Sequence, residues 1–401
     1  MESKSIVYWA PPHEVPSLRN TVSDLLLNNL VKTRMMCEKV LDHINPGDKV
    51  GVKLHIGESH NTRYLRHDYV REVINAIKSK GGIPTLIETQ GLGMSHRHRD
   101  ISDNYRIFIQ CRRNKDDHLK IVHLHGFGED IVGAPFRFID GENGIDGKMV
   151  DIDGIKLKKV PVASGLFDYD KLVIISRFKG HPQAGMGGAM KNLGIGCVNK
   201  HGKALAHYSE SYKVNTRRCD PSKCNQECIK ACPVNAIKIE GERAHIDPSF
   251  CIGCGGCIEV CPIKKAVKSP FFDENDVFSE KFIDNTLGVL AAYGRERIRY
   301  INIAIEVTLI CDCAVSVNMP VCPDLGIFGS DDPLAIDKAC LDAEIDAPGL
   351  TFLDPKGNWT DPIARGIEKF HALNPVVDPT MQIDAAIKNK IGNINYELTK
   401  I

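Results

Sequence analysis

The sequence predicts an α/β protein: a core with a largely parallel sheet, interrupted by a small inserted α+β domain. Strand-like and helix-like periodicities alternate along most of the 401 residues, whereas residues 213–268 are rich in cysteine, glycine and proline. A chain of this length is long for one hydrophobic core. We therefore expect a first part of the core in residues 1–212, the small domain in 213–268, and the second part of the core with a C-terminal tail in 269–401.

The clearest α/β unit lies in the first quarter of the chain. Residues 48–55 alternate valine or leucine with other residues, which is typical of a strand. Residues 67–80 repeat apolar side chains at helical spacing and stop at Gly81 and Gly82. A second strand follows at residues 83–87. These short connections predict a right-handed βαβ unit on a parallel sheet.

Weaker signals predict the remaining elements of the core. Strands are expected at residues 120–124, 171–176 and 300–307. A helix is expected at residues 333–343, capped by the aspartates before its first proline. Residues 375–401 are expected to form a peripheral helix and tail.

Composition excludes several classes of protein. Lys plus Arg and Asp plus Glu each total 51, so the balanced charge argues against a nucleic-acid binder. No stretch reaches the roughly 20 apolar residues of a membrane helix, and residues 1–12 lack the features of a signal peptide. We expect a cytoplasmic protein without a membrane partner. Its 15 cysteines are then better interpreted as metal ligands than as disulfides.

The most specific motif is C-x2-C-x2-C-x3-C-P, formed by Cys251, Cys254, Cys257 and Cys261 with Pro262. This is the spacing with which bacterial ferredoxins bind 4Fe–4S clusters. Three thiolates would line one cubane, and the fourth would start a helix and reach a second cluster. A zinc knuckle is the alternative, but it typically uses two separated cysteine pairs. Because such clusters degrade in air, an anaerobic host is plausible.

A second group of four cysteines precedes this motif with wider spacing. Cys219, Cys224, Cys228 and Cys232 are separated by four, three and three residues, and Pro233 follows. A degenerate site with a single cluster in the protein is the alternative, although retention of all four cysteines in order argues against it. Residues 234–247 between the motifs predict a hairpin that turns at residues 240–242.

This segment resembles the two-cluster bacterial ferredoxins. The resemblance implies two 4Fe–4S clusters with crossed ligation. One cluster would be held by Cys251, Cys254, Cys257 and Cys232, and the other by Cys219, Cys224, Cys228 and Cys261.

A glycine-rich segment in the core, residues 177–197, follows the strand that ends at residue 176. It carries Lys179, His181 and Lys191 among six glycines, and its backbone could face an anion. It matches neither G-x-G-x-x-G nor a Walker A loop, so no nucleotide is implied. A tight packed loop and a substrate or anion site remain equally open interpretations.

Further candidate residues follow predicted strands. Cys311 and Cys313 flank Asp312 at a predicted strand end, where both thiols would face one way and, with Cys197 and Cys322, could hold a metal or act in redox chemistry. The alternative is that they are small buried hydrophobes, as expected for Cys37, Cys111 and Cys340. Lys53, His55 and Glu58 lie at the carboxyl end of a strand, where either a ligand site or a solvated loop is expected.

Three segments together resemble the family called domain of unknown function 362, which often carries ferredoxin modules. They are residues 52–58, residues 179–197, and residues 311–313 with 330–337. The resemblance implies an α/β core with an embedded two-cluster domain, and it assigns no reaction. It supports a candidate site made of Lys179, His181, Lys191, Cys197, His207, Cys311 and Cys313.

These observations predict an iron–sulfur redox protein that moves electrons through two 4Fe–4S clusters to or from a site in the core. It would be an oxidoreductase acting with a redox partner protein or a small-molecule substrate. One alternative is an electron-carrier or docking subunit without chemistry of its own. A lower-ranked alternative is a protein that delivers a metal or cluster. No flavin or nicotinamide fingerprint is visible.

Overall fold

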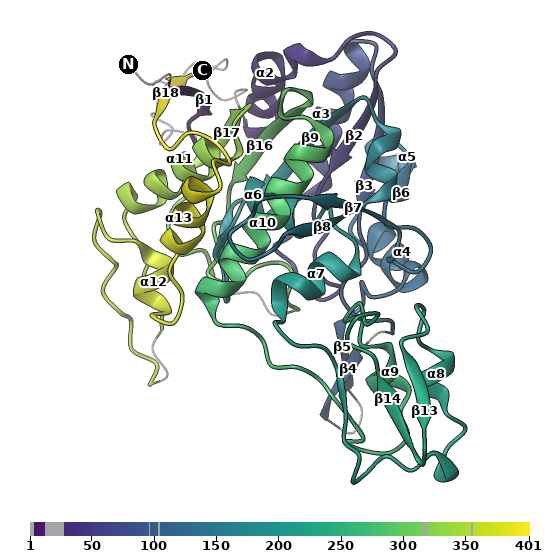
Figure 1. Ribbon diagram of the computed structural model, residues 1–401. Coiled ribbons are helices and arrows are strands. Elements are labelled where there is room, and N and C mark those ends of the chain that lie inside the picture. Colours follow the sequence, from purple (N-terminus) through teal and green to yellow (C-terminus); the bar gives the residue numbers. More distant parts are fainter. Residues whose placement is uncertain (1–3, 13–27, 96, 103–104, 316–318, 354–355) are drawn as a thin grey trace.

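The computed structural model describes residues 4–12, 28–95, 97–102, 105–315, 319–353 and 356–401. An eight-stranded sheet forms its centre (Figure 1), and β17 alone runs against the other seven strands. The expected largely parallel sheet is confirmed. In spatial order its strands are β18 (Tyr396–Lys400), β1 (Ser5–Ala10), β17 (Gly326–Ser330), β16 (Ile298–Ala304), β9 (Lys171–Arg177), β2 (Lys49–Lys53), β3 (Ile83–Glu88) and β6 (Phe136–Phe138).

Helices cover both faces of the sheet because successive strand residues point to opposite sides. In β9, Leu172 and Ile174 pack into one hydrophobic cluster, while Val173 and Ile175 pack into the other. One face is covered by α2 (Asn29–Val40), α3 (His67–Ser79), α4 (Lys115–Leu124) and α5 (Glu129–Val132). The other face is covered by α6 (Ala189–Gly194), α7 (Lys200–His207), α10 (Asn275–Tyr293), α11 (Pro333–Asp346), α13 (Thr380–Lys388), and the hairpin of β7 (Gly147–Asp151) and β8 (Lys159–Ala163).

The predicted βαβ unit is present as β2, α3 and β3, with β2 and β3 paired in parallel. Helix α3 buries Val70, Val73 and Ile77 against the sheet. It ends where Gly81 adopts φ +80° and its N–H donates to the carbonyl of Lys78. A glycine is favoured there because other residues rarely adopt this left-handed conformation.

Four expectations about elements need correction. Residues 120–124 lie in α4, not in a strand, because the side chain of Asn114 caps a helix that runs through them. The expected strand at residues 300–307 is β16, which begins at Ile298 and ends at Ala304. The helix expected within residues 375–401 is α13, but the tail after it forms a strand, β18, that pairs with β1. Cys311 and Cys313 lie in a turn, not at the end of a strand.

The cysteine-rich segment forms a small module below α7 in Figure 1, beside the hairpin of β4 (Arg97–Ser102) and β5 (Tyr105–Gln110). It has its own hydrophobic cluster. The expected hairpin around residues 240–242 is confirmed, but Cys261 follows a helix, α9 (Gly256–Val260), and does not start one. The module comprises β12 (Lys213–Val214) paired with β15 (Val267–Lys268), α8 (Glu227–Lys230), β13 (Ile237–Glu240) paired with β14 (Arg243–Ile246), and α9 (Gly256–Val260).

Two short elements complete the described chain near the candidate site. The glycine-rich segment folds into a hairpin of β10 (Lys179–His181) and β11 (Gly185–Gly187), and α6 follows it. Helix α12 (Lys369–Leu373) lies near this hairpin. Within the described residues, no helix combines the length and apolar character needed to span a membrane.

Candidate functional site

The cysteines of the module come together in two groups of four. Around Cys228, burial raises the thiol pKa, and the neighbouring thiols of Cys261, Cys219 and Cys224 raise it further. The other four thiols line one small cavity, where burial and the neighbouring thiols raise the pKa of Cys257 to about 12. That cavity is lined by Cys232, Cys251, Cys254 and Cys257.

The backbone around the thiols fits an iron–sulfur cubane. Gly253 and Gly255 have φ values of +70° and +77°, which glycine adopts readily and which let the backbone turn closely around the thiols. The N–H of Ala236 donates to Cys232 Sγ at 3.2 Å, and that of Ala244 donates to Cys219 Sγ at 3.4 Å. Four soft thiolates with such donors are the ligand set that 4Fe–4S clusters take.

The module contacts the core through α9 and α7. The carboxylate of Glu259 in α9 accepts hydrogen bonds from the backbone N–H groups of Met94 and Ser95 and forms an ion pair with Arg113. Helix α7 lies against the cysteine loop so closely that a Cβ on Gly253 would come within 2.5 Å of the Ala204 Cβ. The loop that carries Cys251 and Cys254 is therefore fixed against α7.

A cavity of about 190 Å³ lies on the core side of α7. Its wall is built where β2, β3 and β9 end, the edge at which open α/β sheets bind ligands. Lys203 and His207 of α7 also line it. One helix, about 10–12 Å across with its side chains, thus separates the cysteine loop from the cavity.

Most charges in the cavity wall are paired. The ammonium of Lys53 lies 2.7 Å from the Glu88 carboxylate, and that of Lys179 lies 3.3 Å from Asp312. Although burial favours the neutral acid, Lys53 holds the pKa of Glu88 well below its ordinary range, and Lys179 does the same for Asp312. These pairs are buried and therefore weakly screened by solvent.

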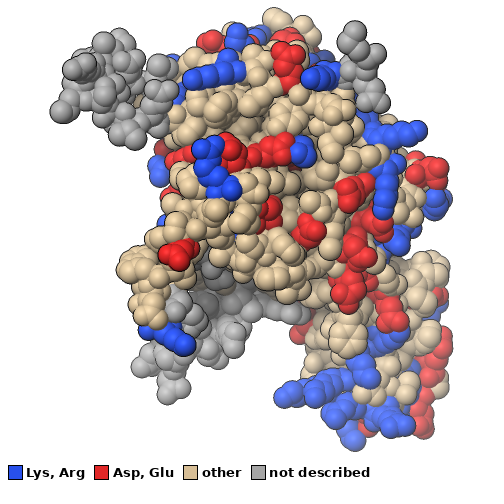
Figure 2. Space-filling view, turned by 90° about the vertical axis from the view of Figure 1, so that its left-hand side faces the viewer, with Lys and Arg blue, Asp and Glu red and all other residues tan. Residues whose placement is uncertain are grey.

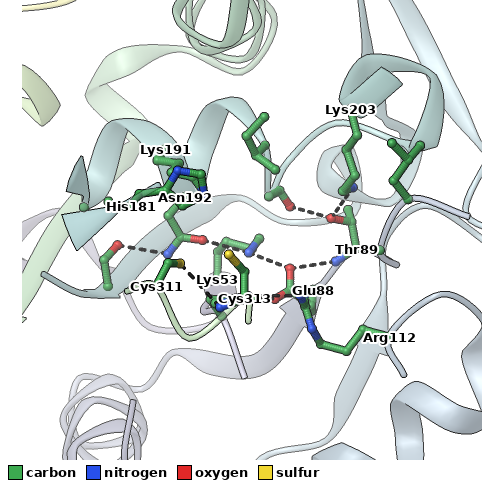
Figure 3. A pocket seen from close by; sticks show the side chains of 18 of the residues that line it. Lys53, Glu88, Thr89, Arg112, His181, Lys191, Asn192, Lys203, Cys311 and Cys313 are labelled. Atoms are coloured by element: carbon green, nitrogen blue, oxygen red, sulfur yellow. Dashed lines mark hydrogen bonds and ion pairs between the residues drawn. The ribbon is translucent and has the colours of Figure 1, made fainter. Parts of the chain in front are cut away.

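Lys191 is the exception. It projects from α6 toward the cavity (Figure 3), and within the described residues it has no hydrogen bond or ion pair. Its charge acts on His181, His207 and Cys313, and it forms no ion pair with a carboxylate of the part of the chain that the structure describes. An anionic group in the cavity would supply the missing partner.

Two histidines complete this part of the wall. His207 Nδ1 lies 3.1 Å from Gln183 Oε1, and its ring stacks on Phe278. Burial and the nearby Lys191 charge lower the pKa of His207 to about 3. Burial, with the same lysine, lowers the pKa of His181 to about 4. Both rings are therefore neutral at neutral pH.

The structure gathers most of the core residues that the sequence singled out. Lys179, His181, Lys191, His207, Cys311 and Cys313 all line the cavity. Cys197 does not: it is fully buried in the hydrophobic core, where burial raises its thiol pKa to about 12. Cys322 is likewise buried there.

Of the strand-end residues, Lys53 and His55 line the cavity, where Lys53 is buried and His55 is partly exposed. Glu58 is buried behind the wall, where its carboxylate accepts from Arg112 and from the backbone N–H of Cys111. Sequence reasoning missed several lining residues. Glu88 follows the predicted strand at residues 83–87, so the strand-end rule could have found it. The others missed include Thr89, Arg112, Asn192 and Lys203.

Short segments of iron–sulfur proteins resemble this chain. A ferredoxin from Alicyclobacillus acidocaldarius is 36% identical over 50 residues, 12% of this chain and 64% of the ferredoxin. A tetrathionate reductase subunit from Archaeoglobus fulgidus is 42% identical over 67 residues, 15% of this chain and 32% of that relative. ABC transporter E family member 1 of Arabidopsis thaliana is 43% identical over 58 residues, 13% of this chain and 10% of that protein. The chain spans less than two thirds of each of these three relatives.

Among solved structures, the lactate racemase apoprotein from Thermoanaerobacterium thermosaccharolyticum aligns with 75% of this chain and 51% of its own, at a TM-score of 0.33 and 12% identity. The model of the family described as domain of unknown function (DUF362) matches residues 50–342, which is most of the chain. The protein therefore belongs to the DUF362 family and carries a ferredoxin-like module within the α/β core.

Proposed function

We propose that this protein is an iron–sulfur oxidoreductase that moves electrons through two 4Fe–4S clusters to or from a substrate in the core cavity. The observation that carries the proposal is the position of α7. Ala204 of this helix packs against the cysteine loop at Gly253, and Lys203 and His207 line the cavity. A module that exchanged electrons only with other proteins would not require contact between its cysteine loop and a helix of the cavity wall.

The grouping of the thiols supports crossed ligation. Cys232 would join Cys251, Cys254 and Cys257, and Cys261 would join the three cysteines of the first motif. When bound, each cluster supplies one-electron transfer at a potential set by charge, hydrogen bonds and exposure. The N–H groups of Ala236 and Ala244 supply such hydrogen bonds, one on each group of thiols.

Anaerobic iron and sulfide quantification tests this assignment. We expect about eight irons per chain and coupled cubane signals in electron paramagnetic resonance after reduction. Cys232→Ser and Cys251→Ser should impair the same cluster although the residues lie in different motifs, and Cys261→Ser should impair the other. Cys322→Ser, a buried cysteine outside the module, is the matched control. A wild-type content of about four irons would refute the two-cluster proposal.

A docking role is the second candidate, and the charge of the module favours it. Figure 2 shows Lys and Arg side chains gathered at the lower tip of the molecule, where the module lies. A partner with an acidic surface would be attracted there, and its association would weaken with salt. The exposed basic residues of the module include Lys213, Arg217, Arg218, Lys223, Lys264, Lys265 and Lys268.

A further inference from the structure

Two thiols from one short turn meet at the cavity wall. The backbone N–H of Cys313 donates to Cys311 Sγ at 3.4 Å. Both sulfurs and a ring nitrogen of His181 lie within 4.8 Å of one another. Cys311 is only 1% exposed, whereas Cys313 is partly exposed and faces the cavity (Figure 3). The Cys313 thiol is therefore accessible from the cavity, and the Cys311 thiol is buried beside it.

This spacing would also suit a metal ion, but the hydrogen bonds of His181 argue against that use. Its Nδ1 accepts from the backbone N–H of Ala184 at 2.9 Å and of Gln183 at 3.2 Å. An Nδ1 that accepts cannot carry the proton, so the neutral ring carries it on Nε2. A metal-bound histidine normally donates from its other nitrogen, which is not possible here. The ring instead presents an N–H donor to Cys313.

The surroundings make the two thiols unequal. The hydrogen bond from Cys311, aided by His181 and Lys191, holds the pKa of Cys313 well below its ordinary value despite burial. Burial and the neighbouring Cys313 raise the pKa of Cys311 well above it. A stabilised thiolate beside a protonated thiol is the arrangement of nucleophile and resolving cysteine in dithiol chemistry.

We propose that Cys313 and Cys311 form a redox-active dithiol that reduces a small anionic disulfide in the core cavity. Lys191, which forms no ion pair with a carboxylate in the described structure, binds the anionic group. This inference rests on the proposed function, because the electrons that restore the dithiol arrive through the module. The inference assigns a reaction to the core site, whereas membership of the DUF362 family assigns none.

The chemistry balances in two stages. The Cys313 thiolate attacks one sulfur of the substrate R–S–S–R, forming a mixed disulfide and releasing one thiolate. Cys311 gives its proton to the released thiolate, forming R–SH, and attacks the Cys313 sulfur, forming the Cys311–Cys313 disulfide and releasing the second thiolate. Two electrons, delivered singly, and one proton then return this disulfide to the Cys313 thiolate and Cys311 thiol, and a second proton from solvent goes to the second released thiolate. The net change is R–S–S–R plus two electrons and two protons to two R–SH.

The test uses the full-length protein with its iron–sulfur content intact, under anaerobic conditions, and two disulfides of similar size. Dithiodiglycolate carries two carboxylates, and 2-hydroxyethyl disulfide is neutral. After reaction with dithiodiglycolate, peptide mass spectrometry should show an internal Cys311–Cys313 disulfide in the wild type. Cys311→Ser should trap the mixed disulfide on Cys313, and Cys313→Ser should form neither. Cys322→Ser, buried outside the cavity, should behave as wild type.

Lys191→Met tests the anion site. The preference for dithiodiglycolate over the neutral disulfide should fall roughly tenfold, the size expected for one charge-assisted hydrogen bond. Wild-type circular dichroism and thermal unfolding of the core show that each variant is folded, and wild-type iron content shows that its module is intact. An unchanged preference would overturn the assignment of Lys191, and a wild type that forms only a mixed disulfide, as Cys311→Ser does, would overturn the dithiol. A metal retained on both thiols would also overturn it.

Reduction of the internal disulfide separates this inference from the proposed function. The clusters are first reduced with dithionite, excess reductant is removed, and dithiodiglycolate is then added to form the Cys311–Cys313 disulfide. As the clusters reduce this disulfide, their paramagnetic signals should disappear. If the disulfide forms but the signals persist, the electron path to the cavity is wrong and the thiol chemistry stands. If the clusters are reoxidised by other acceptors while no disulfide forms, the dithiol is wrong and the module remains a redox carrier.

Discussion

At the scale of single residues, the cavity wall depends on buried charged side chains that form ion pairs with one another. The Lys53 ammonium donates to Leu54 O and Asn192 Oδ1 and lies 2.7 Å from Glu88, and both side chains are at most 3% exposed. Such a pair contributes little net stability compared with apolar residues of the same shape, but breaking it leaves a buried charge without a partner. Because the folded pKa of Glu88 is depressed, its contribution is present above the unfolded pKa and is lost as pH falls through the folded one.

Removing one partner of this pair should therefore be costly. We expect Lys53→Met to lower the free energy of unfolding at neutral pH by about 3–5 kcal/mol, because the Glu88 carboxylate is left buried and unpaired. Adding Glu88→Gln should restore part of the loss, which denaturant titration of the wild type and both variants would measure. Lys158→Met, which removes a pair on the surface, is the control and should have no measurable effect. Equal losses in the single and double variants would contradict this account.

At the scale of elements, hydrophobic periodicity predicted those helices and strands that the local sequence determines. The βαβ unit at residues 48–87 followed from alternation, helical spacing and the glycine stop. Residues 120–124 look like a strand by themselves, but the cap at Asn114 and the aspartates after it start a helix that continues through them. The cavity wall could be predicted only in part. Lys203, Asn192 and Arg112 lie on elements whose meeting depends on packing of the whole sheet, which no short pattern encodes.

Helix α6 shows how such a distant contact positions the site. It carries Lys191 and Asn192, and its N-terminus is capped from another helix: the Asp337 carboxylate of α11 accepts from the N–H groups of Ala189 at 2.7 Å and Met190 at 2.9 Å. It also accepts from Asn302 Nδ2. Short helices need such tertiary caps because their own hydrogen bonds are few.

We expect Asp337→Ala to cost about 2 kcal/mol of unfolding free energy, because two helix N–H donors and an amide lose their acceptor. Hydrogen exchange of the α6 amides should accelerate with it, while Asp337→Asn should retain much of the protection. Burial raises the pKa of Asp337 to about 6, so wild-type stability should fall as pH rises from about 4 to 6, a trend absent in Asp337→Asn. Asp331→Ala, an exposed neighbour, is the control. Unchanged exchange in Asp337→Ala would show that α6 does not depend on this cap.

At the scale of the whole molecule, two hydrophobic units of unequal size share one chain. The core has two large clusters of buried residues on the faces of the sheet, whereas the module has one small cluster bordered by its cysteines. Covalent spacing of cysteines revealed the module in the sequence, because that spacing is itself the ligand geometry. Its attachment through Glu259 and Ala204 was not foreseeable, since those contacts join segments far apart in the chain.

A module with so small an apolar core should depend on its metal for folding, because the free energy of metal binding is then also free energy of folding. We expect anaerobic iron removal to unfold residues 213–268 and to leave the sheet and its helices folded. Limited proteolysis should then cut the iron-free protein within that segment and release fragments of the core that remain resistant, whereas the iron-loaded protein, as control, should resist cleavage there. Far-ultraviolet circular dichroism should retain most of its helical signal. If the core were digested as fast as the module, the two units would be a single cooperative fold, and the contact at α7 would be structural support for the core as well as a route for electrons.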